Sequence, residues 1–228
     1  MIIFDPAKHV YTNSFTKEIY TGVSSILSKF KEEFDSDKFS RIIADRRGVS
    51  QQAVLDEWSA NAKDAADYGT RVHKAIEEFA KTGIIDDDQK EIIYRYRDAG
   101  GPTAKEGALF EQLVYSHVHK IAGTSDVIYP IGGYFDVIDF KTNKKFNFFS
   151  KYEKFLYSPV DHLPECEYSS YALQLSLYAY CYQSMSGRKP RSLKIFYWNR
   201  DSKAFDVIPL PYLKSDVENI LKKLPSLL

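Results

Sequence analysis

The chain has 228 residues, of which 44% are hydrophobic, enough for the buried core of one large domain. Basic and acidic residues both number 31, so the net charge of zero is no argument for a polyanionic partner. Two cysteines, Cys166 and Cys181, are too few for a disulfide framework, a four-cysteine zinc site or an iron–sulfur cluster. Neither a signal peptide nor a stretch of ~18 apolar residues for a membrane span is present, so we expect a cytoplasmic protein.

The N-terminal part is predicted to be mainly helical. Residues 1–28 contain short β-rich stretches that lead into a helix start, and residues 34–80 have a helical pattern. A second, more solvated helix is predicted over 86–98. Within 61–80 the apolar residues recur every three or four positions and form one amphipathic stripe, made of Ala65, Tyr68, Val72, Ala75, Ile76 and Phe79. Gly83 suits the C-terminal end of this helix.

β-branched and aromatic residues then predict strands over 108–115, 120–129 and 133–142. Residues 143–168 are irregular. The last third is predicted as a helix that is apolar nearly all round (170–185), a hairpin (192–198 and 204–209) and a terminal helix (213–224).

These elements predict an α/β (α+β) fold, with a central mixed sheet flanked by helices. We expect one domain over 1–228. It is divided into a helical insertion at 34–60, a core at 61–182, and a C-terminal hairpin and helix at 190–228.

The densest chemical signal lies in the strand predicted over 133–142. Side chains alternate along a strand, so Asp139 and Lys141 share one face. A carboxylate and an ammonium in a buried strand need partners, because unpaired burial of either costs several kcal/mol. A hairpin turn at 130–133 can bring Asp126 alongside Asp139. Two carboxylates with a lysine suit a hard divalent cation; the alternative is a structural ion pair or a solvated sheet edge.

Two further groups of residues are candidates. Gly69, His73 and Glu77 are spaced by four on one helix, so that glycine allows close backbone approach and histidine supplies a nitrogen ligand. A boundary histidine and a surface glutamate are the plainer explanation. Gln174 and Tyr178 are also four apart: they either form a hydrogen-bonded pair within the core, or reach the substrate phosphate and orient the lysine.

Taken in order, GTRVHKAIE (69–77), Glu111, GTSD (123–126), IDFKT (138–142) and YALQLSLYAY (171–180) resemble the RecB-like branch of the PD-(D/E)xK nuclease superfamily. Phage-type exonucleases and the mitochondrial genome-maintenance exonuclease are the most similar members. The resemblance covers residues 60–182, and weakly 20–25. It implies a restriction-endonuclease-like core with an N-terminal helical elaboration, in the cytoplasm of a bacterial or phage-infected cell.

The resemblance also implies a site. One or two Mg²⁺ or Mn²⁺ ions would be held by His73, Asp126, Asp139 and the backbone carbonyl of Phe140. Lys141 would orient or activate the attacking water, and Glu111 would be a further ligand or a supporting acid. Gln174 and Tyr178 match a Q-x-x-x-Y motif associated with DNA positioning. Burial near a cation would lower the pKa of the lysine. Some relatives hold an iron–sulfur cluster, which this chain cannot ligate.

The irregular segment 143–157 interleaves lysines with aromatic residues, among them Lys144, Lys145, Phe148, Phe149 and Tyr152. Lysines follow a phosphate backbone and aromatic rings stack on unpaired bases, which favours single-stranded DNA as the partner. Alternatively, the rings fold back into a satellite core. No obligatory protein partner can be inferred.

We therefore expect a metal-dependent exonuclease acting on single-stranded or frayed DNA ends, in replication, recombination or repair. A structure-dependent endonuclease and a catalytically silent DNA-binding subunit of the same fold remain the alternatives.

Overall fold

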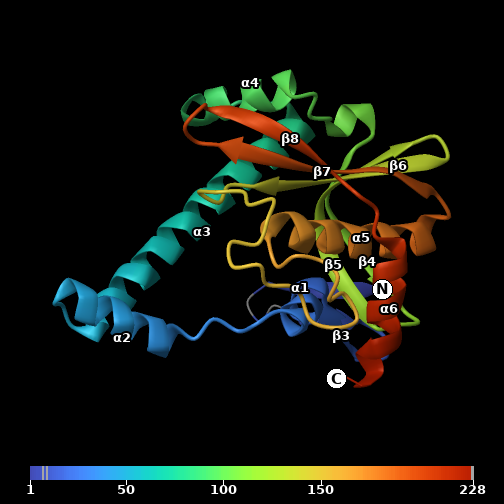
Figure 1. Ribbon diagram of the computed structural model, residues 1–228. Coiled ribbons are helices and arrows are strands. Elements are labelled where there is room, and N and C mark those ends of the chain that lie inside the picture. Colours follow the sequence, from blue (N-terminus) through green and yellow to red (C-terminus); the bar gives the residue numbers. More distant parts are fainter. Residues whose placement is uncertain (7, 9, 227–228) are drawn as a thin grey trace.

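The computed structural model describes residues 1–6, 8 and 10–226, which form one mixed sheet of eight strands (Figure 1). The strand order is β1-β2-β3-β5-β6-β7-β8, and β4 pairs with β5 outside this path. The β3–β5 and β6–β7 pairs are parallel and the others antiparallel. The strands are β1 (Ile2–Asp5), β2 (Val10–Asn13), β3 (Ile19–Gly22), β4 (Leu109–Ser116), β5 (Ile121–Ile131), β6 (Tyr134–Lys141), β7 (Lys189–Asn199) and β8 (Ala204–Leu210). The predicted α/β class, with a mixed sheet between helices, is confirmed.

Helices cover both faces of this sheet (Figure 1). The α-helices are α1 (Val23–Leu27), α2 (Ser36–Arg47), α3 (Gln51–Thr82), α4 (Lys90–Asp98), α5 (Glu167–Ser186) and α6 (Lys214–Lys223). Short 3-10 turns occupy Ser28–Phe30, Asp87–Gln89, Ala104–Glu106 and Leu224–Ser226. None of the helices in the described part combines the length and apolarity needed to cross a membrane.

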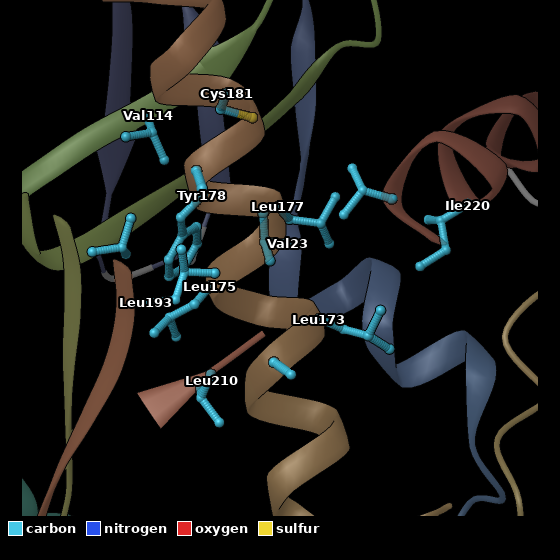
Figure 2. Packing of buried hydrophobic residues seen from close by; sticks show 14 of the residues in the cluster. Val23, Val114, Leu173, Leu175, Leu177, Tyr178, Cys181, Leu193, Leu210 and Ile220 are labelled. Atoms are coloured by element: carbon cyan, nitrogen blue, oxygen red, sulfur yellow. The ribbon is translucent and has the colours of Figure 1, made fainter. Parts of the chain in front are cut away.

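Side chains along β6 point alternately to the two faces of the sheet and so divide the core into two layers. Phe135 and Val137 pack into a cluster with α1, α5 and α6, whereas Ile138 and Phe140 pack on the other side against α3 and α4. Figure 2 shows α5 within the first cluster, with Leu173, Leu175, Leu177 and Tyr178 directed to different neighbours around the helix. This helix is buried nearly all round, as its composition predicts.

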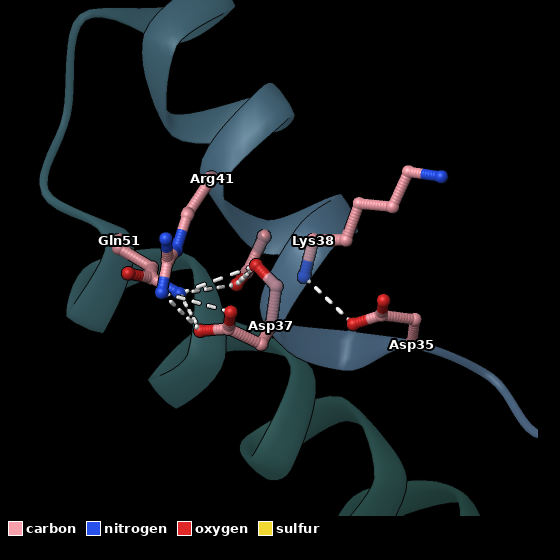
Figure 3. Close-up of polar contacts among 6 residues, drawn as sticks. Asp35, Asp37, Lys38, Arg41 and Gln51 are labelled. Atoms are coloured by element: carbon pink, nitrogen blue, oxygen red, sulfur yellow. Dashed lines mark hydrogen bonds and ion pairs between the residues drawn. The ribbon is translucent and has the colours of Figure 1, made fainter.

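The segment 34–60 contains two helices rather than one continuous helix. Gly48 adopts a left-handed conformation (φ +65°) that ends α2, and Ser50 caps α3 by accepting a hydrogen bond from the backbone N–H of Ala53. Figure 1 shows α2 and the start of α3 projecting away from the sheet. Their junction is polar: Gln51 Nε2 donates to Asp37 Oδ1 at 2.9 Å, and Asp37 also pairs with Arg41 (Figure 3).

Gly123 on β5 leaves the space that the Tyr178 ring occupies in the core. A Cβ at this position would lie 2.6 Å from Tyr178 Cε1 and 3.2 Å from Val23 Cγ2. We predict that Gly123→Ala lowers the free energy of unfolding by about 1–3 kcal/mol, because the buried ring must shift. Urea denaturation measures the change. Gly133→Ala, which meets no atom within 4 Å, is the matched control; equal stability of the two variants would contradict this account of the packing.

Candidate active site

Three adjacent strands each contribute one carboxylate to the same row of the sheet. Phe110 and Gln112 of β4 pair with Val127 and Ser125 of β5, which places Glu111 opposite Asp126. The last β5–β6 pair is Val127 with Ile138, so Asp139 occupies the next position opposite Asp126. The predicted hairpin therefore brings Asp126 and Asp139 together, with Glu111 on the other side.

The sheet is interrupted on both sides of Asp126. Glu111 has a left-handed φ of +50°, which is rare for a residue with a side chain and is a strained conformation within a strand. Side chains four residues apart on a regular strand point to the same face of the sheet. Phe110 and Val114 instead pack in the two clusters on opposite faces, so the alternation of side chains along β4 changes at Glu111. On the β6 side, the Phe140 N–H donates to Asp126 Oδ2 at 2.7 Å. Both neighbouring strands thus leave room around this carboxylate.

His73 approaches Asp126 from α3. Its Nδ1 lies 3.4 Å from Asp126 Oδ2, and single ligand atoms of His73, Glu111 and Asp126 all lie within 4.8 Å of one another. Gly69, one turn before His73, faces the Thr142 side chain at the end of β6: a Cβ there would lie 3.1 Å from Thr142 Oγ1. A close backbone approach at Gly69 stays a prediction.

Asp139 and Lys141 form a buried ion pair beside this cluster. Lys141 Nζ lies 2.5 Å from Asp139 Oδ2, and Asp139 is only 3% exposed. The same ammonium lies over the ring of Tyr171, 4.7 Å from its centroid. In the described part of the chain, Asp139 Oδ2 has no other polar partner. A buried carboxylate oxygen with a single contact can still accept a cation.

The charges of the site shift one another. Burial, followed by the charge of Asp126, raises the pKa of Asp139 to about 6 and that of Glu111 to about 7. Burial would also raise the pKa of Asp126, but His73 and Lys141 outweigh burial and lower it. The pKa of His73 is raised, because Asp126 outweighs the opposing effect of burial.

Lys141 differs from the sequence-based expectation. Burial does favour its neutral form, but the charges of Asp139 and Asp126 outweigh burial and raise its pKa. The expected lowering depended on a nearby cation, whereas the chain itself surrounds the ammonium with carboxylates. The protein alone therefore holds Lys141 charged.

An open cleft of about 790 Å³ is bordered by His73, Glu111 and Lys141, with the half-buried Asp126 and the buried Asp139 behind these residues. It is lined by α3 between Ala65 and Glu77, by Glu111, by the end of β6 and by Tyr171. The sequence pattern drew no attention to Tyr171, although it lies one helical turn before Gln174 in the same apolar helix. Its position over Lys141 could be found only once α5 was placed on β6.

The residues predicted to position DNA have different surroundings. Tyr178 is buried, and Gln174 Nε2 donates to its hydroxyl at 3.0 Å, which is the core pair considered above. Gln174 is half-buried and lines a separate small pocket with Tyr171. Substrate contact by Gln174 and Tyr178 stays a prediction.

The aromatic–basic segment divides into a packed part and an exposed part. Phe146 contacts Tyr171 and Tyr197, and Phe148 contacts Phe146, with 5.0 Å between their ring centroids. Phe149 and Tyr152 are 81% and 71% exposed. Lys144 and Lys145 are also exposed. The satellite core thus accounts for Phe146, and base stacking by the exposed rings stays a prediction.

Comparisons with known proteins give no family assignment. No family model matches the chain, and no curated protein matches it. Among solved structures it is similar to SSO0001, with 15% identity, a TM-score of 0.44, and coverage of 94% of this chain and 79% of that one. It is also similar to a protein from Eubacterium rectale named putative exonuclease, with 12% identity, a TM-score of 0.44, and coverage of 91% and 79%. Likeness at this level carries no argument about activity, which rests on the site itself.

The raised carboxyl pKa values predict how the metal-free protein responds to pH. Between its pKa in the unfolded chain and its raised pKa in the folded protein, such a carboxyl group is protonated only in the folded state. The free energy of unfolding therefore falls as pH rises through about 4 to 7. The raised pKa of His73 acts in the same direction above about pH 6.5. The lowered pKa of Asp126 acts in the opposite direction, because its contribution to stability is lost as pH falls below about 4.

Glu111→Gln removes one of these groups. In EDTA, we predict that the free energy of unfolding of Glu111→Gln minus that of the native chain becomes more positive from about pH 5 to pH 8. Urea denaturation at both pH values measures this difference. Glu78→Gln, on the exposed surface of α3, is the matched control. A difference that stays constant with pH would contradict the raised pKa of Glu111.

Proposed function

We propose that the protein is a Mg²⁺- or Mn²⁺-dependent deoxyribonuclease, of the RecB-like PD-(D/E)xK type, that hydrolyses phosphodiester bonds at single-stranded or frayed DNA ends. The observation that carries the proposal is one juxtaposition. His73, Glu111 and Asp126 place ligand atoms within 4.8 Å of one another, and the Asp139–Lys141 pair lies on the adjacent strand. A role in replication, recombination or repair follows from this activity.

The donor set suits a hard cation. Asp126, Asp139 and Glu111 offer carboxylate oxygens, His73 offers a ring nitrogen, and the Phe140 carbonyl is the further ligand that the family resemblance implies. When bound, one or two such ions supply charge relief on the phosphoryl oxygens and help to form the nucleophile. A cation would also relieve the repulsion that raises the pKa values of Glu111 and Asp139.

Lys141 is suited to act on the phosphate. Its ammonium is held in place by Asp139 on one side and by the Tyr171 ring on the other, and it borders the cleft. A positioned, desolvated ammonium stabilises negative charge that develops on a phosphoryl oxygen. The same group can donate a hydrogen bond that orients the attacking water.

DNA is the proposed substrate because the cleft is open and has cationic and aromatic groups near it. Lys74 lines the cleft, and Lys144 and Lys145 follow the lining residue Asn143 directly. The exposed rings of Phe149 and Tyr152 can stack on unpaired bases, which favours a single strand.

Substitution of the two central carboxylates tests the site. We predict that Asp126→Asn and Asp139→Asn each reduce cleavage at least ~100-fold while DNA binding persists, because a bound ion supplies several kcal/mol of transition-state stabilisation. Asp136→Asn is the matched control, since Asp136 is buried in the same strand but faces Arg191 on the opposite side. It should lower stability and leave cleavage by the folded protein intact. Full activity of Asp126→Asn or Asp139→Asn would refute the assignment.

Digestion of end-labelled linear strands and circular single strands, titrated with Mg²⁺ or Mn²⁺, tests the activity. An exonuclease degrades the linear strand and spares the circle. Cutting of the circle would instead identify the structure-dependent endonuclease. Binding without cleavage of either would identify the silent DNA-binding subunit.

The exposed rings make a further prediction. Tyr152→Ala or Phe149→Ala should raise the dissociation constant for single strands roughly 5- to 150-fold, which corresponds to ~1–3 kcal/mol per stacked base. Thermal unfolding should barely change, because these rings bury little area. Phe146→Ala is the matched control: it should lower the melting temperature, because this ring packs against the core. Unchanged affinity in both exposed-ring variants would place the DNA path elsewhere.

A further inference from the structure

Arg200, in the turn between β7 and β8, lies beside the end of the strand that carries Asp139 and Lys141. Its Nη2 donates to the backbone carbonyl of Thr142 at 3.0 Å. Thr142 follows Lys141 directly and lines the cleft. The guanidinium is therefore attached to the rim of the candidate site, although the turn is remote in sequence.

An aromatic ring fixes the orientation of this arginine. The guanidinium carbon lies 3.8 Å from the centroid of the Tyr68 ring, on α3. Tyr68 is fixed in turn, because Trp198 Nε1 donates to its hydroxyl at 2.7 Å. A guanidinium held by a ring and a carbonyl loses little further side-chain freedom when it binds a ligand.

The charge of Arg200 lacks an anionic partner. No carboxylate in the described part of the chain forms an ion pair with it, and its Nε is buried without a hydrogen bond. Arg191, near the other end of β7, shows the contrast, because it binds Asp136 through two nitrogens at 2.8 and 2.7 Å. Stacking on a ring replaces only part of the hydration that the guanidinium loses. Within the described residues Nη1 also lacks a hydrogen bond and, unlike Nε, it is not buried, so an external anion can reach it.

Two other cations lie near the Tyr68 ring or line the cleft. Arg71 lies 5.8 Å from the centroid of the Tyr68 ring, and Lys74, three residues further along α3, lines the cleft. The cleft also holds Glu77 and Glu111, which repel a polyanion. A strand can approach the buried carboxylates only along cationic side chains that are not already neutralised.

We propose that Arg200, stacked on Tyr68, forms a phosphate subsite that holds a backbone phosphate of the substrate strand next to the one at Lys141. The inference rests on the proposed nuclease function. It specifies in addition that the DNA strand enters the candidate site from the side of the turn between β7 and β8. A planar guanidinium matches two phosphate oxygens and binds them through parallel N–H donors, which an ammonium cannot do.

Binding of a short single strand, measured with Ca²⁺ in place of Mg²⁺, tests the subsite. Arg200→Gln should weaken binding roughly 10- to 150-fold, as for a lost hydrogen bond to a charged group, and reduce the salt dependence of affinity by ~0.7 in log–log slope. Arg200→Lys should keep the slope and lose most of the affinity. Arg188→Gln is the matched control, because Arg188 donates to the Gly132 carbonyl at the opposite end of β7.

Strands with a single neutral methylphosphonate linkage locate the contact. The native chain should bind more weakly when the linkage that Arg200 contacts is neutral. Arg200→Gln should bind that strand as well as the fully charged one, and respond to the other neutral linkages as the native chain does. Arg200→Met, which is also neutral, serves for the same scan if Arg200→Gln unfolds, as melting curves will show. Identical linkage profiles in the native chain and these neutral Arg200 variants, or equal affinities of Arg200→Gln and Arg188→Gln, would overturn the subsite.

The outcomes separate the two proposals. If the native chain cleaves DNA but Arg200→Gln binds unchanged, the subsite is wrong and the nuclease stands. If binding depends on Arg200 at one linkage but no cleavage occurs with Mg²⁺ or Mn²⁺, the subsite stands and the nuclease is wrong. A native chain that does not bind the strand overturns the subsite, whatever its activity.

Discussion

The buried ion pair between Asp139 and Lys141 is the constraint on which the arrangement of the site depends. Two ionised groups within a strand between apolar layers lose most of their hydration, and one contact at 2.5 Å does not replace it fully. The surrounding elements supply the rest: α5 places the Tyr171 ring against the ammonium, and Asp126 adds a second negative charge. The pair is held by the site and would gain a further partner from a cation or a phosphate.

The interruption of the strand pairing beside Asp126 is the second feature of the site. Glu111 adopts a left-handed conformation that interrupts β4, and β6 separates from β5 directly beyond Val127. Such a backbone conformation costs of order 1–3 kcal/mol in isolation. It is tolerated because the strands on both sides of it remain paired and their apolar residues stay packed. The strain thus lies at the position where a ligand would bind.

Strand alternation and hairpin geometry were enough to predict the face shared by Asp139 and Lys141 and the approach of Asp126. The break at Gly48 was visible as a glycine followed by a capping serine, but an amphipathic pattern alone does not show it. The Tyr171 ring beside Lys141 and the partners of Arg200 could not be predicted, because they depend on contacts between elements far apart in the chain. Thr142 and Arg200 are separated by 58 residues, and Trp198 and Tyr68 by 130. Local sequence patterns contain no information on such pairs.

A chain of zero net charge can present a cationic path only if some of its cations lack anionic partners. Lys154 belongs to the aromatic–basic segment, yet it forms an ion pair with Glu32, and Glu165 lies in the same groove. The lysine-rich composition of that segment therefore overstates its attraction for a phosphate. Arg200, by contrast, lies in a turn of ordinary composition, and its guanidinium contacts a ring and a carbonyl but forms no ion pair within the described residues. The attraction of this surface for a polyanion follows from which charges remain uncompensated, rather than from how many basic residues a segment contains.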